Sequence, residues 1–547
     1  MHEISTQLVA LADYKKVRRI DGFERISGEY PIYLTDESKL SPGTFDHLFF
    51  PADESELAAV LQEMVAQKIN VTIAGARTGL VGGCVPRNGA LVSLENFDRV
   101  QAIVYDHSAD EWRVRSQCAV NLRTLNSQLS IKNFPDIERC GDQSALNALH
   151  GFKQDPADYF YPPDPTEMSA SLGGTVATNA SGARTYRYGP TRSWVRKIRV
   201  MLTNGEILSI PRGKYFASPG GEFAVYGSKG SDMRIRLPSY PMPRTKNTSG
   251  FFTSPQMDLI DLFIGSEGGF GVITEVTVAL LRKKETISLV QFLKSDEQAI
   301  DLVYALRKEN RIQLNFLEFY SGKALALMRQ MQIQDPKAVD MPVIPDRAGA
   351  ALFFEFEFAP MADTLDYAAL EKTIKGCGAF ISESWAAYEN RELQRLKDFR
   401  HILPETVNAI IAERKKQHPE LHKLGTDLAV PDDRLRDMWQ IYKNALDKAD
   451  LQWVALGHIG NNHIHINILP RNGIELNKGL ALYQQFAAKA IEFGGTVSAE
   501  HGIGKMKIKF LELMYSPDQI DEMRAVKSAF DPEGLLNPGN IFPEDKV

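Results

Sequence analysis

The sequence predicts an α+β fold of about two or three domains. The segment 54–69, ESELAAVLQEMVAQKI, repeats apolar residues at helical spacing, and the β-rich segment 70–76, NVTIAGA, follows directly. After about Lys283, the strand-like runs ISLVQFL, LNFLEFY and ALFFEFEF alternate with helical stretches. With 547 residues, of which 44% are hydrophobic, the chain allows each domain to bury a core of its own.

Composition and charge indicate a globular protein of the cytoplasm. The net charge of −6 argues against a nucleic-acid binder with a broad basic face. No apolar run is long enough to cross a bilayer, and the N-terminus lacks the hydrophobic segment of a signal peptide. Without CxxC spacing, the cysteines fit a reducing compartment better than an iron–sulfur, zinc or disulfide framework; they are Cys84, Cys118, Cys140 and Cys377. Peripheral contact with the inner membrane stays open as an alternative.

Three glycine-rich tracts lie in the first half of the chain, at 74–83 (AGARTGLVGG), 162–191 and 262–281. Glycines let backbone amides approach a ligand closely, and inward-pointing amides bind phosphate oxygens without a lysine. The first tract is neither GxGxxG before a helix nor GxxxxGK before Ser or Thr, so neither a Rossmann site nor a P-loop is indicated. A turn or a packed helix pair explains any one tract, whereas a long cofactor with a pyrophosphate and a flat ring system explains all three.

A histidine cluster stands near the end of the chain, in GHIGNNHIHIN (457–467) and SAEHGIG (498–504). In a strand, His463, His465 and Asn467 would share one face. Imidazole and carboxylate donors of this kind hold a divalent metal with positions left open for a substrate. The pattern favours a metal or acid–base site over core histidines that bond to backbone carbonyls. The other donors are His458, Glu500 and His501.

These motifs resemble those of a known flavoprotein family. AGARTGLVGG, PTEMSASLGGTVATNASGART and GSEGGFGVIT are similar to the flavin-binding loops of the vanillyl-alcohol oxidase superfamily. GHIGNNHIHIN, SAEHGIGK and FDPEGLLNPGNIF resemble its branch of FAD-linked D-2-hydroxy acid dehydrogenases, which act on D-lactate or D-2-hydroxyglutarate or are similar to the FAD subunit of glycolate oxidase. The likeness runs from about Pro51 to the C-terminus.

The resemblance implies a PCMH-type FAD-binding domain of two α/β subdomains at 1–285, with an insertion at about 211–243. An α+β substrate, or cap, domain with an antiparallel sheet follows at 286–480, and a C-terminal segment at 481–547 returns to the FAD domain. We interpret the basic insertion as a solvated loop, with a contact surface for anionic lipid or an electron acceptor as the alternative. Its charged residues include Arg212, Lys214, Lys229, Arg234 and Arg236, against Glu222 and Asp232.

The resemblance also implies residues that contact FAD. The FAD is expected to be non-covalent, because the first loop has no histidine or cysteine for attachment, although Cys84 lies just beyond it. The implied FAD contacts are Gly75, Ala76, Arg77, Thr78, Gly79, Leu80, Gly82, Gly83, Pro163, Asp164, Thr166, Met168, Gly173, Gly174, Ala177, Thr178, Asn179, Gly182, Glu267, Gly271, Val272, Ile273 and Asn537.

The implied activity is FAD-dependent, metal-assisted oxidation of a D-2-hydroxy acid to the 2-oxo acid. His458, His465 and Glu500 would hold the metal, which is zinc, manganese or iron. His501 would remove the hydroxyl proton while hydride leaves for the flavin. Arg400, otherwise an exposed helix arginine, would clamp the substrate carboxylate, and Asn467 would lie near the substrate.

Departures from the family pattern bear on the substrate. Many relatives read HxGDGNxH, whereas this chain has an additional imidazole, His463, as a further ligand or as a group that supports the ligands from behind. Gly425 stands where dicarboxylate-specific relatives have a lysine, which favours D-lactate or a similar monocarboxylate, although Lys423 is close enough to compensate. D-2-hydroxyglutarate dehydrogenase and glycolate oxidase FAD subunit are the alternatives. Gly269 and Phe270 replace a common Thr-Leu, which affects local ring contacts.

Other functions remain open at this point. They are an FAD-binding subunit that only docks electron-transfer partners, a metal-dependent hydrolase without flavin, and an enzyme of the ether-lipid synthase type. If the chain is a dehydrogenase, its electrons pass to a separate acceptor, which is a cytochrome, a quinone, an electron-transfer flavoprotein or an iron–sulfur subunit.

Overall fold

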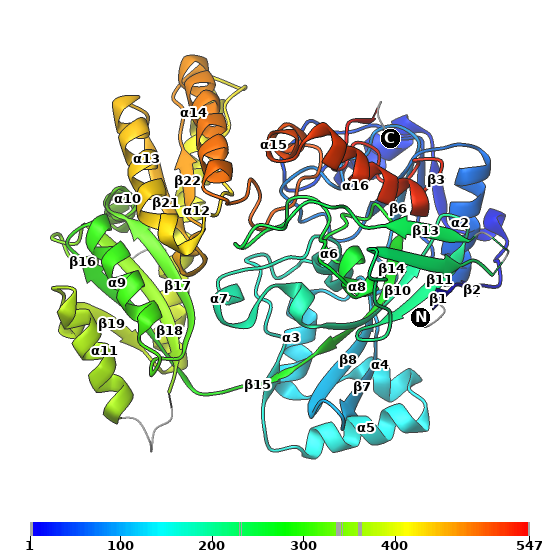
Figure 1. Cartoon of the computed structure of the whole chain (residues 1–547), viewed down its shortest axis with the longest axis horizontal. Coiled ribbons are helices and arrows are strands. Elements are labelled where there is room, and N and C mark those ends of the chain that lie inside the picture. The colour runs from blue at the N-terminus through cyan, green and yellow to red at the C-terminus, as the bar shows by residue number, and fades with distance from the viewer. Residues whose placement is uncertain are drawn as a thin grey trace.

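A computed structural model describes residues 4–228, 230, 232–334, 341, 343–358 and 364–544. The chain forms two bodies that lie side by side (Figure 1). The first body contains the glycine-rich tracts and both ends of the chain, and the second contains most of the middle of the sequence. In the described part of the chain, no helix is both long and apolar enough to cross a membrane.

A four-stranded sheet begins the first body, in the order β3-β4-β6-β5. Strands β4, β6 and β5 run parallel, and helix α2 (Glu54–Ala66) connects β4 to β5. Asp53 caps this helix by accepting a hydrogen bond from the Glu56 backbone N–H, at 2.9 Å. The helix and strand predicted from 54–76 are therefore present. The strands are β3 (Arg19–Asp21), β4 (His47–Phe49), β6 (Ala90–Ser93) and β5 (Val71–Ala74), and helix α1 is Phe23–Glu29.

A six-stranded antiparallel sheet completes this body, in the order β2-β11-β10-β14-β8-β7. Its strands are β2 (Gln7–Leu8), β11 (Glu206–Pro211), β10 (Val195–Met201), β14 (Val272–Ala279), β8 (Glu111–Gln117) and β7 (Val100–Asp106). Its helices are α3 (Leu122–Ile131), α4 (Pro135–Cys140), α5 (Gln143–Gln154), α6 (Leu172–Ala177), α7 (Thr185–Tyr188) and α8 (Leu259–Phe263). Strands β9 (Tyr159–Phe160) and β15 (Leu281–Arg282) pair where the chain leaves for the second body.

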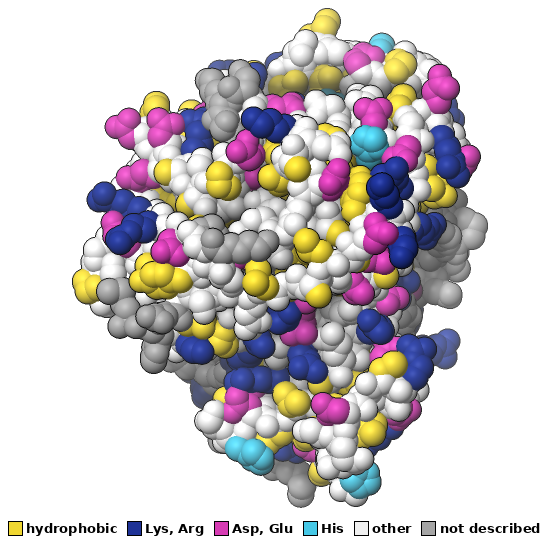
Figure 2. Space-filling model, turned by 90° about the vertical axis from the view of Figure 1, so that its right-hand side faces the viewer, with side chains coloured by type: hydrophobic (Ala, Val, Ile, Leu, Met, Phe, Trp, Pro, Cys, Tyr) yellow, Lys and Arg dark blue, Asp and Glu magenta, His cyan; other side chains and the backbone are white. Residues whose placement is uncertain are grey.

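The segment 211–243 forms a hairpin of β12 (Glu222–Tyr226) and β13 (Met233–Arg236), to which β1 (Ile4–Ser5) adds in parallel. Arg212 pairs with Asp261 of α8, at 3.0 Å, so it belongs to the body of the protein. Lys229 lies outside the described residues. Acidic and basic side chains are interspersed over the face of this body that Figure 2 shows.

A seven-stranded antiparallel sheet forms the second body, in the order β19-β16-β18-β17-β21-β22-β20. Both faces are buried: on β18, Leu352 and Phe354 pack with helices α9, α11 and α13, while Ala351 and Phe353 pack with α10 and α12. The strands are β16 (Thr286–Leu293), β17 (Leu314–Ser321), β18 (Ala350–Glu357), β19 (Ser384–Ala387), β20 (Leu424–Gly425), β21 (Trp453–Gly457) and β22 (His465–Ile468). The helices are α9 (Asp296–Lys308), α10 (Gly322–Gln334), α11 (Thr364–Gly376), α12 (Asn390–Lys415), α13 (Leu435–Lys448) and α14 (Gly473–Glu492). The expected α+β class with an antiparallel sheet is confirmed.

After α14 the chain lies against the first body, where it forms α15 (Ile508–Met514) and α16 (Pro517–Phe530) (Figure 1). The backbone of Asn537 donates to the Val71 carbonyl of β5 at 2.8 Å, and Val71 donates to the Leu535 carbonyl at 2.8 Å. The domain bounds given above stay a proposal, and α14 runs through the second of them.

An aromatic cluster joins α16 to the third glycine-rich tract. Phe270, which is fully buried, lies 4.5 Å from Phe251, 5.8 Å from Phe263 and 5.2 Å from Phe530, measured between ring centroids. Its ring is therefore the centre of the contact that fixes the C-terminal segment to the first body, which accounts for an aromatic residue at this position.

We predict that Phe270→Ala lowers the free energy of unfolding by about 3–5 kcal/mol, because the cluster does not collapse fully around the cavity. Denaturant unfolding followed by tryptophan fluorescence measures the change. Phe216→Ala is the control, since Phe216 is 55% exposed. Equal unfolding midpoints for the two variants would contradict the prediction.

Candidate active site

The backbone leaves little room for side chains where the first tract approaches the second and where the second folds back on itself. A Cβ atom at Gly75 would lie 2.7 Å from the Ser171 Oγ atom, and one at Gly182 would lie 2.0 Å from the carbonyl oxygen of Asp164. Ser171 also caps helix α6, since its Oγ accepts a hydrogen bond from the Gly174 N–H. Glycine is required at these two positions because backbone must pass against backbone or against a cap.

The third tract is tied to the second by backbone hydrogen bonds. Gly265 donates to the Val176 carbonyl at 3.0 Å, and Glu267 donates to the Ala177 carbonyl at 2.8 Å. The carboxylate of Glu267 is half-buried and accepts hydrogen bonds from the backbone of Ile503 and Gly504, at 2.6 and 2.7 Å. The segment SAEHGIG is therefore held against the third tract.

Several of the residues expected to contact FAD have left-handed backbone, which L-residues adopt only where the surroundings impose it: Arg77 (φ 58°), Asn179 (48°), Glu267 (52°) and Asn537 (47°). Asn537 bridges two tracts, since its side chain accepts from the Ile73 N–H and donates to the Gly268 carbonyl. The buried Ser181 Oγ atom has no hydrogen-bond partner in the described part of the chain. A rigid cradle with a free hydroxyl fits a flavin cofactor.

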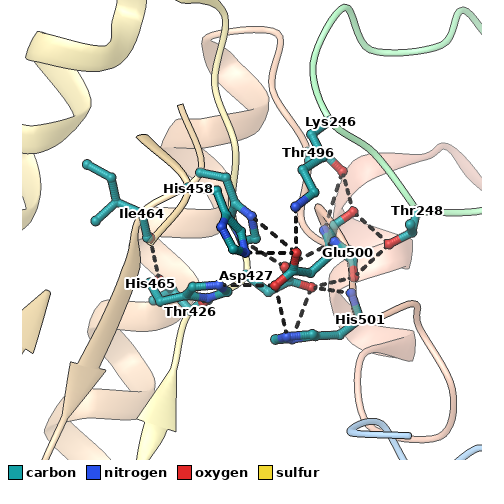
Figure 3. Close-up of polar contacts among 12 residues, drawn as sticks. Lys246, Thr248, Thr426, Asp427, His458, Ile464, His465, Thr496, Glu500 and His501 are labelled. Atoms are coloured by element: carbon teal, nitrogen blue, oxygen red, sulfur yellow. Dashed lines mark hydrogen bonds and ion pairs between the residues drawn. The ribbon is translucent and has the colours of Figure 1, made fainter. Parts of the chain in front are cut away.

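The histidine cluster forms at the edge of the second body that faces the first. His458 follows strand β21, His465 and Asn467 lie on β22, and Glu500 and His501 lie in the loop after α14 (Figure 3). Only His465 to Ile468 form the strand, and His463 stands before it as an isolated bridge to Ala429. The expected shared face still brings the imidazoles of His463 and His465 together, with ring centroids 4.2 Å apart.

Glu500 lies at the centre of the cluster (Figure 3). Its Oε1 atom is 3.1 Å from His465 Nε2, and its Oε2 atom is 3.3 Å from His458 Nε2 and 2.5 Å from the Lys246 ammonium nitrogen. Burial alone would raise the pKa of Glu500, but Lys246 and His458 lower it well below its usual range. The carboxylate is thus held ionised, as a metal ligand must be.

His458 and His465 are oriented by acceptors behind them. The Nδ1 atom of His458 lies 2.5 Å from the Glu318 carboxylate, and the Nδ1 atom of His465 lies 2.9 Å from the Thr426 carbonyl oxygen. Burial and Lys246 lower the pKa of His458, but Glu318 and Glu500 raise it to about 9. Both imidazoles therefore turn Nε2 toward Glu500, as in the carboxylate–histidine arrangement common around metals.

His501 lies on the open side of the cluster. Its side chain is 24% exposed, against 7% for His458 and 0% for His463. The Nδ1 atom lies 3.4 Å from Asp427 and the Nε2 atom lies 3.5 Å from Glu500. A partly exposed imidazole whose two nitrogens lie near two carboxylates is placed to take up a proton from a bound molecule.

Asp427 is fully buried and saturated with donors. It accepts from the backbone N–H groups of Glu500 and His501 (3.2 and 3.1 Å), from Ser498 Oγ (2.7 Å) and from Lys507 Nζ (2.5 Å). Burial raises the pKa of Asp427, but His501 and Lys507 lower it well below its usual range. Asp427, His465, Glu500 and His501 also lie within ligand distance of one another, but Asp427 already accepts four hydrogen bonds that hold the loop of Glu500 and His501.

Arg400 lies on α12, with its Nε atom 3.6 Å from the Glu318 carboxylate, a distance of an ion pair rather than a hydrogen bond. Burial alone would raise the pKa of Glu318, but Arg400 and His458 lower it to about 2. Pro404, four residues further along the helix, has no N–H to donate to the Arg400 carbonyl. The structure thus brings Arg400 to the cluster through Glu318.

The sequence reasoning missed three residues of the cluster: Lys246, Glu318 and Asp427 in its role as an anchor. Lys246 and Glu318 stand far from the histidine motifs along the chain, so no local spacing points to them. Lys423 is exposed beside β20, and Gly425 of that strand lies next to Asn467.

Comparisons with known proteins identify the family of the chain. The family model "FAD binding domain" matches residues 45–139 and 153–211, and "FAD linked oxidases, C-terminal domain" matches 282–541. The chain belongs to the FAD-linked oxidases and is an oxidoreductase with an FAD-binding domain. The family resemblance seen in the sequence is confirmed.

Named relatives cover almost the whole chain at low identity. Glycolate oxidase subunit GlcD of Bacillus subtilis (strain 168) is 26% identical over 521 residues, which are 94% of this chain and 92% of the relative. D-lactate dehydrogenase of Anaerostipes hadrus is 28% identical over 508 residues (89% and 87%). D-2-hydroxyglutarate dehydrogenase of Stutzerimonas stutzeri (strain A1501) is 25% identical over 502 residues (90% and 90%).

Among solved structures, an alkyldihydroxyacetonephosphate synthase is similar in fold, with a TM-score of 0.59, 13% sequence identity and coverage of 97% of this chain and 90% of that one. At that identity the likeness concerns the fold alone.

Proposed function

We propose that this protein oxidises a D-2-hydroxy acid to the 2-oxo acid with FAD and a divalent metal. The observation that carries the proposal is the Glu500 carboxylate, 11% exposed, around which His458 and His465 present nitrogens while His501 faces the open side. The third glycine-rich tract supports this proposal, because its Glu267 binds the backbone of Ile503 and Gly504, in the loop that carries Glu500 and His501.

Each side chain has a task in this proposal. His458, His465 and Glu500 would hold the metal, and Arg400 and Asn467 would bind the substrate carboxylate. Asp427 keeps the N–H of His501 on Nδ1, so Nε2 accepts the hydroxyl proton. When bound, FAD supplies the two-electron acceptor and the metal lowers the pKa of the hydroxyl. Asp427 and Glu500 then stabilise the imidazolium of His501.

The acid is proposed to be D-lactate or a similar monocarboxylate. Purified protein mixed anaerobically with D- and L-2-hydroxy acids should lose its oxidised flavin absorption with D-lactate or another D-monocarboxylate, and the L-acids should leave it unchanged. Working without oxygen removes the unidentified acceptor from the measurement. Bleaching by no 2-hydroxy acid would exclude the proposed activity, and bleaching by L-acids alone would reverse its stereochemistry.

FAD is proposed to be non-covalent, because the loop 74–83 offers no histidine or cysteine and desolvation raises the pKa of the half-buried Cys84 thiol. Acid precipitation should leave the yellow colour in the supernatant. Colour that stays with the precipitate would mean covalent attachment, and Cys84→Ser would then identify the position.

Glu500 and His501 are expected to act through different steps. Glu500→Gln should lose both metal and activity, since it removes the only charged ligand of the proposed set. His501→Ala should keep metal and FAD but slow flavin reduction by about a hundred- to ten-thousandfold. Elemental analysis beside stopped-flow reduction measures both. Full metal in Glu500→Gln, or wild-type reduction in His501→Ala, would refute this division.

The second carboxylate of a dicarboxylic substrate is expected to lack a partner at Gly425. A Cβ there would meet Asn467 Oδ1 at 3.4 Å, an ordinary contact, so Gly425→Lys should fold. A new charge-assisted contact of roughly 1.5–3 kcal/mol should raise kcat/KM for D-2-hydroxyglutarate about 10- to 100-fold, with little change for D-lactate.

Arg400→Ala is the counterpart, and it should raise KM for every 2-hydroxy acid without loss of FAD. Lys397→Ala, an exposed position of the same helix, is its control. An unchanged KM in Arg400→Ala would mean that Arg400 does not bind the substrate. For Gly425→Lys, equal gains in kcat/KM with both acids would mean that position 425 does not determine substrate specificity.

We further propose that a separate acceptor reoxidises the flavin and that the protein resides in the cytoplasm or peripherally at the membrane. Fractionation of cells with and without a high-salt wash distinguishes the two locations, and recovery only in detergent would contradict both.

A further inference from the structure

His463 is the one imidazole of the cluster to which the proposed function gives no task. Its side chain is fully buried. Its Nε2 atom lies 3.0 Å from Asp427 Oδ1, but the contact is bent, and neither ring nitrogen makes a hydrogen bond with any described residue. The protein therefore compensates only in part for the hydration that the polar atoms of this buried imidazole lose.

The position of His463 follows the pattern of the other two imidazoles. Each of the three has one nitrogen against an acceptor: Glu318 for His458, the Thr426 carbonyl for His465, and Asp427 for His463. In each case the opposite nitrogen faces Glu500, at 3.3, 3.1 and 3.9 Å respectively. Each of the three histidines and Glu500 offers one donor atom, and these four atoms all lie within 4.8 Å of one another.

We propose that His463 is a metal ligand through Nδ1, so that three imidazoles and one carboxylate hold the ion. The inference rests on the proposed function for the presence of a metal, and it goes beyond that function by adding a donor that completes a four-residue protein set. The alternative is that Lys246, whose ammonium lies 2.5 Å from Glu500, keeps the cluster together without any ion.

The additional donor determines which metals suit the site. Zinc prefers four ligands in a tetrahedron, and catalytic zinc sites keep one position open by using three protein ligands. Four protein donors would fill a zinc shell and leave no position for a 2-hydroxy acid. Metals that accept six ligands, such as Mn²⁺ or Fe²⁺, keep two positions free, enough for the hydroxyl and carboxylate oxygens of one substrate molecule.

Metal binding without turnover tests the proposal. The FAD-loaded protein, stripped of metal with a chelator, is titrated with Co²⁺, whose absorption in the red, beyond that of oxidised flavin, is weak with five or six ligands and intense with four. The wild type should bind one Co²⁺ with weak bands. The His463→Asn variant should bind Co²⁺ with intense bands. Its affinity for Mn²⁺ should also fall, by more than the roughly 10- to 100-fold that the loss of a residue supporting a ligand is expected to cause.

His418→Asn, a change in a histidine whose side chain is 43% exposed, is the matched control, and FAD content and circular dichroism establish that each variant is folded. A direct count needs no variant: pulsed electron paramagnetic resonance of the Mn²⁺-loaded wild type should detect three coordinated imidazoles. Two imidazoles, or identical Mn²⁺ affinity in His463→Asn, would overturn the proposal, as would failure of the wild type to bind either ion.

The outcome is separable from that of the proposed function. If D-2-hydroxy acids bleach the flavin but only two imidazoles coordinate the metal, this inference is wrong and the proposed activity stands. Three coordinated imidazoles without bleaching by any 2-hydroxy acid would do the reverse.

Discussion

The arrangement of the whole site depends on the buried carboxylate of Asp427. Glu500 and His501 are neighbours in a loop without regular structure, and nothing in their own backbone fixes where they point. Asp427 accepts both of their N–H groups and the Ser498 hydroxyl, and it pairs with Lys507. A charged acceptor with several donors at low dielectric is far more restrictive than a neutral one. One side chain of the second body therefore sets the loop on which metal binding and proton transfer are both proposed to depend.

The same loop is held from the opposite side by Glu267. The backbone of Glu267 is left-handed, and its carboxylate accepts hydrogen bonds from the N–H groups of Ile503 and Gly504. Asp427 accepts those of Glu500 and His501. Two carboxylates, one from each body, thus hold one loop a few residues apart. Any change in how the two bodies pack would therefore be transmitted to this loop.

Periodicity and short motifs were enough to predict the fold class, the flavin tracts and the residues of the cluster that share a motif. His463 and His465 come together because alternation along an extended segment is a local property. The sequence did not predict the roles of Lys246, Glu318 and Asp427, because these roles depend on tertiary packing. Lys246, for example, lies in a loop more than 200 residues before Glu500 in the sequence. The hairpin in 211–243 was missed for a similar reason, since its partner strand β1 lies at the N-terminus.

The charges of the cluster are paired one against one. Lys507 neutralises Asp427, Arg400 faces Glu318 and Lys246 neutralises Glu500. Because the buried anions are already balanced, a divalent ion at Glu500 would leave the site with an excess of two positive charges. A 2-hydroxy acid brings one negative charge in its carboxylate, and it acquires the second only when its hydroxyl proton passes to His501. Because His501 keeps that proton, the net charge of the site stays the same in this step, and only its distribution changes. The new negative charge would develop on the hydroxyl oxygen beside the divalent ion, and an attraction that grows along the reaction in this way lowers the barrier rather than only tightening the complex.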